Sequence, residues 1–456
     1  MLHPHSVRAY DIRGTVGIHL SEQSAFFLGQ QFGRYLRNES QGIPQTVAVG
    51  YDGRTSSPSL VQELINGLTQ EGISVINIGM VPTPLVYFAV QTLSCDAGIA
   101  VTGSHNPPQD NGFKITLKDR PFYGDDLQNL QKVSQLFPPS ENGTVQSIAV
   151  ESSYKQWLKQ LVPSPLPLKI VWDTGHGVVG KMIHEIAEMA CEQSIFLYPE
   201  VDGRFPAHAP NPSDHCAMQD LQKAVLDHQF DLGVGFDGDG DRLGIVDSKG
   251  RLLGGDQLLA ILARDVLTRC PGAVILSDIK TSRGIIDFVT RYGGQIELCP
   301  SGHSKVKEAM KQKKALLAGE VSGHFFLGEE YFGFDDGIYA LFRLLRFLSA
   351  SNQSIDDLLD GLPSLVTTPE YRMHYPEETK FQRINDIQNQ LMADQVSFNA
   401  IDGIRVDLEK GWWLLRASNT EAAISIRLEA LTSNDFPMIK NHLLQYFPEA
   451  QSILMA

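Results

Sequence analysis

The sequence predicts an α/β protein of three related units, followed by a smaller α+β module. Over the first two-thirds of the chain, short apolar strands alternate with amphipathic helices, which is typical of sheets layered with helices. Similar segments also recur. Residues 96–103 (DAGIAVTG) resemble residues 231–238 (DLGVGFDG), and residues 315–320 form a third apolar strand that runs into a polar loop. After residue 369 the strands alternate in polarity, which indicates an antiparallel sheet with flanking helices.

The first unit shows this alternation element by element. Residues 47–50 read as a strand, and Ser57 with Pro58 suit the N-cap and the first position of a helix. Apolar residues at helical spacing follow as far as Gly72, and residues 73–78 predict the next strand.

Each unit also contains a strand that ends in an aspartate: Asp52, Asp173 and Asp278. Ligands of open α/β sheets bind at the ends of strands. We therefore expect each unit to direct one loop to a common centre. Connectors rich in proline or glycine divide the chain into units 1–150, 151–253, 254–366 and 367–456.

The 456-residue chain has the composition of a globular protein of about three domains, or four small ones. Its formal net charge of −15 argues against general binding to nucleic acid or to an anionic membrane. No apolar run approaches the roughly 20 residues that span a bilayer, no signal-peptide pattern is present, and five isolated cysteines fit a reducing compartment. We expect a cytoplasmic protein with no membrane contact, and its oligomeric state stays open.

The loop at residues 236–242 (FDGDGDR) has the composition of a metal site. Asp237, Asp239 and Asp241 alternate with glycines, so an extended loop directs the three carboxylates to one side. Hard oxygen ligands suit a divalent cation such as Mg²⁺. An EF-hand is excluded because Arg242 and Ser248 stand where its glycine and glutamate belong. A solvated acidic turn is the alternative, although three adjacent carboxylates repel one another without a cation.

The loop at residues 102–108 (TGSHNPP) places Ser104 between glycine and histidine, where we expect an exposed hydroxyl. Once phosphorylated, such a serine is a good phosphoryl donor. Because glycine, serine, asparagine and proline are all turn residues, a plain turn is the alternative.

The loop at residues 175–181 (GHGVVGK) resembles two nucleotide-binding motifs. It matches the dinucleotide pattern G-x-G-x-x-G, with Glu200 near the distance of a ribose-binding acid, and it nearly matches a P-loop. Met182 stands where a P-loop needs serine or threonine. A tight turn between a strand and a helix is the preferred interpretation.

Two later loops offer groups for a sugar phosphate. In residues 319–324 (GEVSGH), Glu320 and Ser322 lie on one side if the segment is extended, where they suit two adjacent sugar hydroxyls, and His324 could serve as acid or base. In residues 416–420 (RASNT), Arg416 offers a bidentate fork for phosphate. The neutral donors beside it are Ser418, Asn419 and Thr420. A surface loop and a polar hairpin turn are the respective alternatives.

Taken together, these loops resemble the α-D-phosphohexomutase superfamily over nearly the whole chain. Residues 9–14 (AYDIRG) are similar to its N-terminal signature, 102–107 to its phosphoserine loop, and 111–114 (NGFK) to the segment that follows. Residues 237–242, 319–324 and 416–420 are similar to its metal, sugar and phosphate loops. The sugar loop resembles that of the bacterial phosphomannomutase/phosphoglucomutase branch, and the departures at Val321 and Glu421 touch no proposed contact.

The resemblance implies three mixed-sheet α/β domains and a smaller α+β C-terminal domain around a central cleft. It implies Mg²⁺, held by the three aspartates with Ser104, and a hexose 1,6-bisphosphate as activator and intermediate. Ser104 would be the phosphoryl carrier, with Arg13 and Lys114 near it and His324 as a further catalytic group. Glu320 and Ser322 would contact the sugar 3- and 4-hydroxyls. The other implied substrate contacts are Tyr10, Arg242, Lys280 and His303, with Arg416, Ser418, Asn419 and Thr420 toward phosphate.

The implied activity is the interconversion of hexose 6-phosphate and hexose 1-phosphate, with mannose and glucose phosphates as substrates. Phosphoglucosamine mutase is the alternative within the superfamily. From the residues alone, a metal-dependent phosphatase and an NAD-dependent oxidoreductase stay open as remote alternatives.

Overall fold

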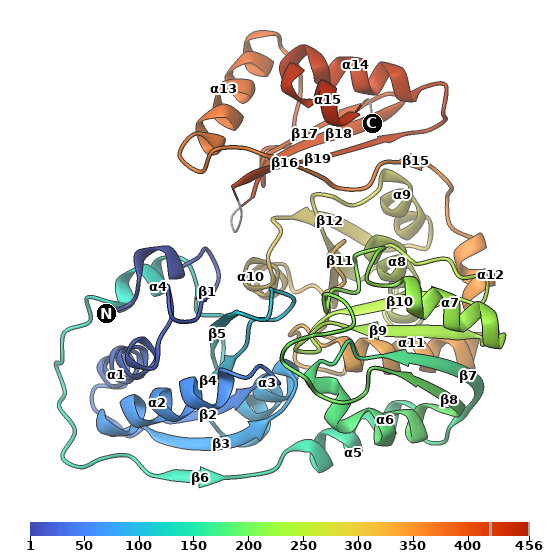
Figure 1. Cartoon of the computed structure of the whole chain (residues 1–456). Coiled ribbons are helices and arrows are strands. Elements are labelled where there is room, and N and C mark those ends of the chain that lie inside the picture. Colours follow the sequence, from blue (N-terminus) through green and yellow to red (C-terminus); the bar gives the residue numbers. More distant parts are fainter. Residues whose placement is uncertain (419–421, 455–456) are drawn as a thin grey trace.

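The computed structural model describes residues 1–418 and 422–454. Three mixed sheets follow one another along the chain, and a smaller antiparallel sheet follows them (Figure 1). This arrangement confirms the predicted fold class. The divisions at residues 150, 253 and 366 stay predictions.

The first sheet has the strand order β1-β5-β4-β2-β3-β6. Its strands are β1 (Ile12–Thr15), β2 (Thr46–Tyr51), β3 (Ser74–Met80), β4 (Ala97–Val101), β5 (Asp110–Leu117) and β6 (Val145–Ser147). Its helices are α1 (Glu22–Glu39), α2 (Ser57–Gln70), α3 (Thr83–Thr92) and α4 (Asp125–Leu130).

The second sheet has the order β10-β9-β7-β8 and the third the order β12-β11-β13-β14. The strands are β7 (Leu166–Asp173), β8 (Cys191–Leu197), β9 (Leu232–Phe236), β10 (Leu243–Asp247), β11 (Val274–Asp278), β12 (Gln295–Cys299), β13 (Leu317–Gly319) and β14 (Phe325–Leu327). The helices here are α5 (Glu151–Leu161), α6 (Ile183–Ala190), α7 (Gln219–His228), α8 (Gly255–Arg269), α9 (Arg283–Arg291), α10 (His303–Lys313), α11 (Gly337–Ser351) and α12 (Ile355–Asp360).

The three sheets share one four-strand pattern, which confirms that the units are related. The four strands of this pattern are β2 to β5 in the first unit, β7 to β10 in the second and β11 to β14 in the third. In each set, the first strand lies between the second and the third, these three run parallel, and the fourth pairs antiparallel with the third. Asp52 directly follows β2, the first strand of the pattern in its unit, and Asp173 and Asp278 are the last residues of β7 and β11. The loop after the third strand begins at residue 102, 237 or 320, so all three candidate loops leave equivalent strand ends.

Alternation along β2 divides the packing of the first sheet. Val47 and Val49 belong to the hydrophobic cluster that α1 and α2 cover, whereas Ala48 belongs to the cluster that includes α3. The second cluster continues through the second and third units, so these units share one core. The predicted helix start is wrong by one residue: Ser56 is the N-cap of α2, and the Ser57 hydroxyl donates to Asp52 Oδ1 at 2.6 Å instead.

The C-terminal unit forms a separate antiparallel sheet. Its strands are β15 (Val366–Thr367), β16 (Tyr371–His374), β17 (Ile404–Leu408), β18 (Gly411–Ala417) and β19 (Ala423–Ala430), and its helices are α13 (Lys380–Ala393), α14 (Phe436–Tyr446) and α15 (Gln451–Leu454). Figure 1 shows it above the third unit, near α9 and β12. It has its own hydrophobic core.

Residues 279–283 of the third unit, here called the anchor segment, hold the C-terminal unit. Arg405 Nη1 donates to the carbonyls of Ile279 (2.8 Å) and Thr281 (2.7 Å), and Arg427 Nη1 donates to that of Lys280 at 2.9 Å. Ile279 also packs with buried Trp412 of β18. This contact combines hydrogen bonds with one small hydrophobic cluster, in contrast to the continuous core of the first three units.

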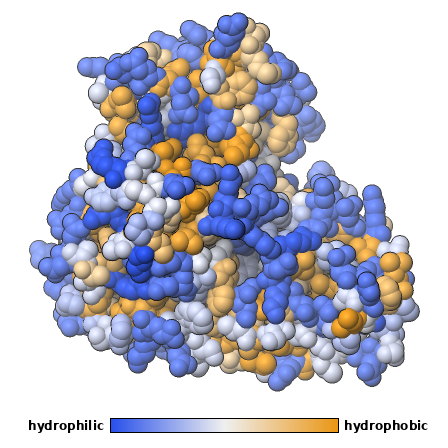
Figure 2. All heavy atoms as spheres, turned by 180° about the vertical axis from the view of Figure 1, so that it is seen from behind, coloured by the Kyte–Doolittle hydropathy of each residue, from blue (hydrophilic) through white to orange (hydrophobic). Residues whose placement is uncertain are grey.

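The opposite face of the molecule is mostly hydrophilic, with a group of hydrophobic residues below the uppermost lobe (Figure 2). Among the described helices, none combines the length and the apolar character that crossing a bilayer requires.

Candidate active site

A buried aspartate and arginine build the loop that carries Ser104. Asp52 Oδ2 accepts hydrogen bonds from Thr102 Oγ1 (2.8 Å) and from the Gly103 amide (3.1 Å). Arg54, which is fully buried against Asp52, donates to the carbonyls of residues 104, 106, 107 and 110. One guanidinium therefore fixes the whole turn, and Ser104 takes the left-handed conformation at φ +49°.

Ser104 itself is buried, with 1% of its surface exposed, so our expectation of an exposed hydroxyl is wrong. The reason is that the metal loop of the second unit covers it: a Cβ on Gly238 would lie 2.5 Å from the Ser104 carbonyl oxygen. Ser104 Oγ donates to Asp237 Oδ2 at 2.8 Å. The two loops that we selected from the sequence therefore meet through their proposed functional atoms.

The aspartate triplet is fully buried, and one carboxylate oxygen from each of its members lies within 4.8 Å of the others. Asp239 Oδ1 has no hydrogen-bond partner among the described residues, and Asp241 Oδ1 lies 3.3 Å from His324 Nε2. Burial and the neighbouring carboxylates of Asp239 and Asp241 raise the pKa of Asp237 well above its ordinary value. The unpartnered Asp239 oxygen, the crowded negative charge and three hard ligands fit a divalent cation, so this triad could hold a metal ion.

Lys114 and Thr83 brace the triplet from the first unit. Lys114 Nζ contacts Asp239 Oδ2 at 2.8 Å and also pairs with Asp241. Burial lowers the pKa of Lys114, but the two aspartates outweigh that effect and raise it, so the ammonium stays charged. Thr83, at the start of α3, donates through Oγ1 to Asp239 Oδ2 at 2.6 Å.

Arg13 lies beside the Ser104 loop, as the resemblance implied. Its Nη1 donates to Asn106 Oδ1 at 2.9 Å, and its Nη2 pairs with Asp11 at 2.6 Å. The buried Nε has no partner among the described residues. Arg13 therefore adds positive charge beside the Ser104 loop, at Asn106.

The sugar loop is a turn, because the Gly323 amide donates to the Glu320 carbonyl at 2.9 Å. The condition under which we placed Glu320 and Ser322 on one side, an extended segment, is therefore not met. The turn gathers Glu320 and Ser322 around His324. His324 Nδ1 lies 3.3 Å from Glu320 Oε2 and 3.2 Å from Ser322 Oγ. Burial and Arg242 lower the pKa of His324, but Asp241 and Glu320 outweigh them and raise it to about 9.

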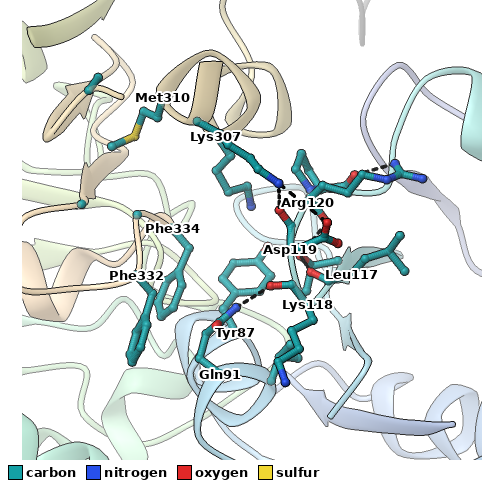
Figure 3. A pocket seen from close by; sticks show the side chains of 17 residues that line it. Tyr87, Gln91, Leu117, Lys118, Asp119, Arg120, Lys307, Met310, Phe332 and Phe334 are labelled. Carbon is teal, nitrogen blue, oxygen red and sulfur yellow. Dashed lines mark hydrogen bonds and ion pairs between the residues drawn. The ribbon is translucent and has the colours of Figure 1, made fainter. Parts of the chain in front are cut away.

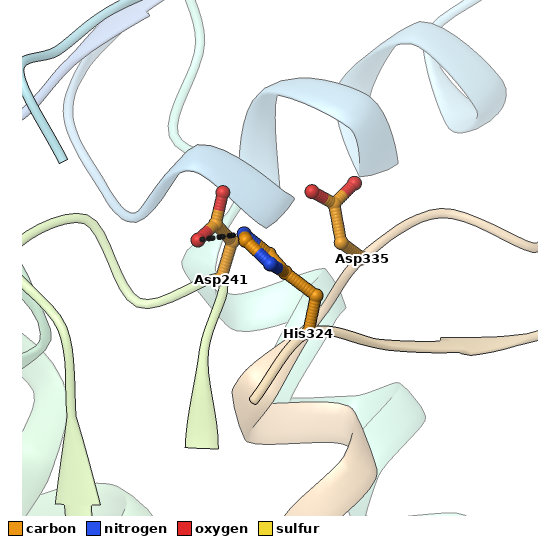
Figure 4. Close-up of side chains that lie close together, drawn as sticks. All are labelled: Asp241, His324 and Asp335. Carbon is orange, nitrogen blue, oxygen red and sulfur yellow. Dashed lines mark ion pairs between the residues drawn. The ribbon is translucent and has the colours of Figure 1, made fainter. Parts of the chain in front are cut away.

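His324 also joins a second cluster of possible metal ligands, with Asp241 and Asp335 (Figure 4). Its Nε2 lies 3.3 Å from both Asp241 Oδ1 and Arg242 Nε. A guanidinium and a protonated imidazole already supply positive charge here, so this cluster suits a cation less well than the triplet does. Asp335 pairs with Lys307 at 3.0 Å.

Tyr10 and His303 lie edge to face, with ring centroids 6.1 Å apart. Gly302 between them has φ +115°, and a Cβ there would lie 2.7 Å from the Tyr10 ring. Both ring nitrogens of His303 are buried without a hydrogen-bond partner among the described residues. The Gly302 amide donates to Glu320 Oε1 at 2.7 Å, which connects this loop to the sugar loop.

The expected phosphate-binding cations lie where the third and C-terminal units meet. Arg416 Nε donates to Asp402 Oδ2 at 2.6 Å, and the same oxygen accepts the Ser301 amide at 3.1 Å. Lys280 Nζ lies 3.3 Å from both Asp278 Oδ2 and Glu370 Oε2. Ser418 is buried beside Arg416, whereas the predicted contacts Asn419 and Thr420 lie outside the described residues.

A cavity of about 280 Å³ lies between α3 and the end of β5 on one side and α10 on the other (Figure 3). It is lined by Lys118, Arg120, Lys307 and Lys311, with Tyr87, Phe332 and Phe334. Three of these cations already have carboxylate partners: Asp126 for Arg120, Asp335 for Lys307 and Asp119 for Lys311. The cavity contains none of the predicted site residues.

The glycine-rich loop at residue 175 is a structural turn. The Gly177 amide donates to the Thr174 carbonyl at 2.6 Å, and the Val178 amide donates to the Gly238 carbonyl at 3.0 Å. The Gly177 amide closes the turn and the Val178 amide supports the metal loop, and a short 3₁₀ turn follows instead of a phosphate-binding helix start. The structure gives no support to dinucleotide binding here.

Several residues of this centre were missed by our sequence reasoning, namely Arg54, Thr83, Asp335, Glu370 and Asp402. Each acts across a long sequence separation, and none lies in a motif. The signal that could have found one of them is the strand-end position of Asp52, because its neighbour Arg54 begins the following loop.

Known proteins show the same construction. Models of the phosphoglucomutase/phosphomannomutase family match this chain in four parts: α/β/α domain I at residues 4–135, domain II at 152–250, domain III at 254–366 and the C-terminal domain at 370–436. A phosphomannomutase/phosphoglucomutase of Pseudomonas aeruginosa is 40% identical over 95% of this chain and 93% of its own length. A phosphoglucomutase of Neisseria gonorrhoeae is 38% identical, with 95% of both chains covered.

A solved structure agrees with these relatives. The crystal structure of a phosphoglucomutase/phosphomannomutase family protein from Burkholderia thailandensis superposes with a TM-score of 0.89 at 36% identity, and the match covers 99% of this chain and 98% of that one. Similarity in sequence and in structure thus extends over all four units. The chain belongs to the phosphoglucomutase/phosphomannomutase family.

Proposed function

We propose that this protein is a phosphohexomutase that interconverts hexose 6-phosphate and hexose 1-phosphate through phosphorylated Ser104. The observation that carries the proposal is the contact between Ser104 Oγ and Asp237 across two units, beside Lys114 and the aspartate triplet. A nucleophilic hydroxyl, a cation site and fixed positive charge are what phosphoryl transfer needs.

The proposed reaction has two transfers. In the first, a sugar hydroxyl attacks the phosphorus of phosphoserine 104, the bond to Ser104 Oγ breaks, and the hydroxyl proton passes to a base. The product is a hexose 1,6-bisphosphate, which turns end for end. In the second, Ser104 Oγ attacks the other phosphoryl group, and the sugar oxygen leaves with a proton. Serine and sugar each end as they began, apart from the position of the phosphate.

We assign roles to the surrounding groups from their positions. Ser104, Asp237, Asp239 and Asp241 would hold Mg²⁺, which when bound supplies electrostatic stabilisation of the transferring phosphoryl group. Lys114 and Arg13 add positive charge at the same place. Protonated His324 suits the donation of a proton to the leaving oxygen, and the identity of the base is left open.

We further propose that the third and C-terminal units hold the sugar and its non-reacting phosphate. Glu320 and Ser322 would contact the 3- and 4-hydroxyls. Arg416, Ser418, Asn419, Thr420, Lys280, Tyr10, His303 and Arg242 would surround the remainder of the substrate. Because the bisphosphate must turn, the C-terminal unit has to loosen and close again, and residues 363–369 are the proposed hinge.

Mannose and glucose phosphates are both proposed substrates, because the two sugars share the hydroxyls assigned to Glu320 and Ser322 and differ only at C2. The Pseudomonas relative is named for both activities. Glucosamine phosphate is the alternative substrate within the superfamily.

The test is a coupled assay with mannose, glucose and glucosamine 1-phosphates, with free phosphate measured in parallel. Active protein should carry one phosphoryl group by intact mass, and Ser104→Ala should abolish both that group and turnover. Undiminished mutase activity of Ser104→Ala, or release of phosphate in place of isomerisation, would contradict the proposal.

A further inference from the structure

Glu370 places a carboxylate among the cations that we assign to substrate phosphate. It lies between the linker at residues 362–369 and β16, and its Oε2 is 3.3 Å from Lys280 Nζ. The Lys280 side chain is 8% exposed and that of Glu370 is 20% exposed. This ion pair therefore joins the third unit to the first residues of the C-terminal unit.

The carboxylate of Glu370 stays ionised in this setting. Burial raises its pKa, but Lys280, a hydrogen bond from Ser425, and the charges of Arg372 and Arg416 outweigh burial and lower the pKa to about 2. Glu370 thus carries a full negative charge next to two of the proposed phosphate ligands.

The two ion-pair partners of Lys280 among the described residues differ in one respect. Asp278 belongs to the same unit as Lys280, ends β11 and is completely buried. Glu370 belongs to the other side of the junction and is partly exposed. A phosphate dianion that approaches Lys280 can displace Glu370, whereas Asp278 stays in place behind the lysine.

Asp402 offers a contrast within the same junction. It accepts a hydrogen bond from Arg416 Nε at 2.6 Å and another from the Ser301 amide at 3.1 Å. Asp402 therefore orients the guanidinium through Nε, and not through the two Nη atoms. Glu370, by comparison, contacts the ammonium group that is itself the proposed ligand.

We propose that Glu370 is a built-in counter-ion that competes with the non-reacting phosphate of the substrate for Lys280. This inference rests on the proposed function. As a consequence, the affinity of this part of the site for phosphate is lower than Lys280 alone would give. The bisphosphate can then be released and turn between the two transfers. Removal of the charge should tighten phosphate binding rather than weaken it.

The experiment compares Glu370→Gln with Glu370→Asp, which keeps the charge, and with Glu378→Gln, an exposed position in the same unit with the same change in net charge. Calorimetry measures the Kd of inorganic phosphate and of glucose 6-phosphate, and steady-state assays measure KM and kcat. Glu370→Gln should lower Kd and KM by about three- to tenfold and should not raise kcat. Glu378→Gln should stay within about twofold of the wild-type protein. Glu370→Asp keeps the charge on a shorter side chain, and its Kd should lie between those of the wild-type protein and Glu370→Gln.

The same substitutions in a Lys280→Met protein test whether Glu370 affects phosphate binding through Lys280. Without the lysine, phosphate should bind more weakly, and Glu370→Gln should bring no further gain. Weaker or unchanged binding by a folded Glu370→Gln protein would overturn the proposal, as would a gain that persists without Lys280. If Glu370→Gln does not fold, a Lys280→Met protein that binds phosphate as well as the wild type would overturn it.

Binding and turnover separate this inference from the proposed function. If the wild-type protein binds sugar phosphates but does not isomerise them, the proposed function fails. The competition between Glu370 and phosphate would still be measurable by calorimetry.

Discussion

The two ends of the candidate active site differ in the sign of the charge that they offer to a ligand. At the reacting end, Ser104 and three fully buried aspartates come from the first and second units, and Asp239 Oδ1 lacks a partner among the described residues. At the phosphate end, Lys280 and Arg416 come from the third and C-terminal units, and each already has carboxylate partners. One end has unused negative charge, and the other has positive charge that is already neutralised.

We infer from this difference that the two ends bind their ligands in different ways. At the reacting end, three buried carboxylates suit a metal ion, so binding of the cation there adds a component. The phosphate end is assembled from two units that meet through the small anchor segment, so binding there exchanges one anion for another. A site with one fixed end and one exchangeable end suits a ligand that must turn round while it stays near the protein.

The largest expected effect comes from breaking the fixed end. Asp239→Asn should lower kcat by more than about a hundredfold, because the triplet loses its central charge and Lys114 loses a partner. Calorimetry with Mg²⁺ should show weakened binding as well. Asp227→Asn, an exposed aspartate of the same unit, is the matched control. Wild-type dependence on Mg²⁺ in the Asp239→Asn protein would remove the metal-site interpretation.

Next in size is Glu320→Ala, which lies between the two ends. The loss of a charged acceptor that contacts both His324 and the Gly302 amide should lower kcat/KM by about ten- to a hundredfold. The reduction should be similar for mannose and glucose phosphates, and galactose phosphate, with C4 inverted, should be a poor substrate of the wild-type protein. Selective loss of one of the two activities would show that Glu320 distinguishes the sugars at C2.

At the exchangeable end, Arg416→Ala should raise KM by about tenfold and leave kcat closer to the wild-type value, since the arginine is assigned to the non-reacting phosphate. Arg383→Ala, in an exposed pair with Glu449 of the same unit, is the control. A fall in kcat with unchanged KM would assign Arg416 to the transferring phosphoryl group instead.

The smallest effect sharpens the comparison within the phosphate end. Asp402→Asn should raise KM by about three- to fivefold, because Arg416 loses the group that orients it. This change is opposite in sign to the one expected for Glu370→Gln. A lower KM for both variants would mean that both carboxylates compete with phosphate, and the contrast between them would disappear.

The sequence was a good guide to what is repeated and local. The three strand-end aspartates and the loops after the third strands lie at equivalent positions because one topology occurs three times. It was a poor guide to which side chains are covered. Ser104 was expected to be exposed, yet Gly238, more than a hundred residues later, lies against it.

Long-range pairing also limits what can be predicted about the site. The ion pairs of Lys280 with Glu370 and of Lys114 with Asp239 join different units, and no periodic pattern records them. The extended geometry expected for residues 320–322 failed for a local reason, because a turn closed by Gly323 replaces it. Motif residues were therefore identifiable, whereas their orientation and their supporting partners were not.

The hold of Arg54 on the Ser104 loop affects how long a phosphorylated molecule persists. Since this guanidinium binds four carbonyls of the turn, the loop cannot fold away from the space between the units. A phosphoryl group on Ser104 would therefore stay between the two units while no sugar is bound. If Ser104 is the carrier, slow hydrolysis of this group would turn a preparation into a mixture of phosphorylated and unphosphorylated molecules. Their ratio records how recently the protein met a sugar phosphate.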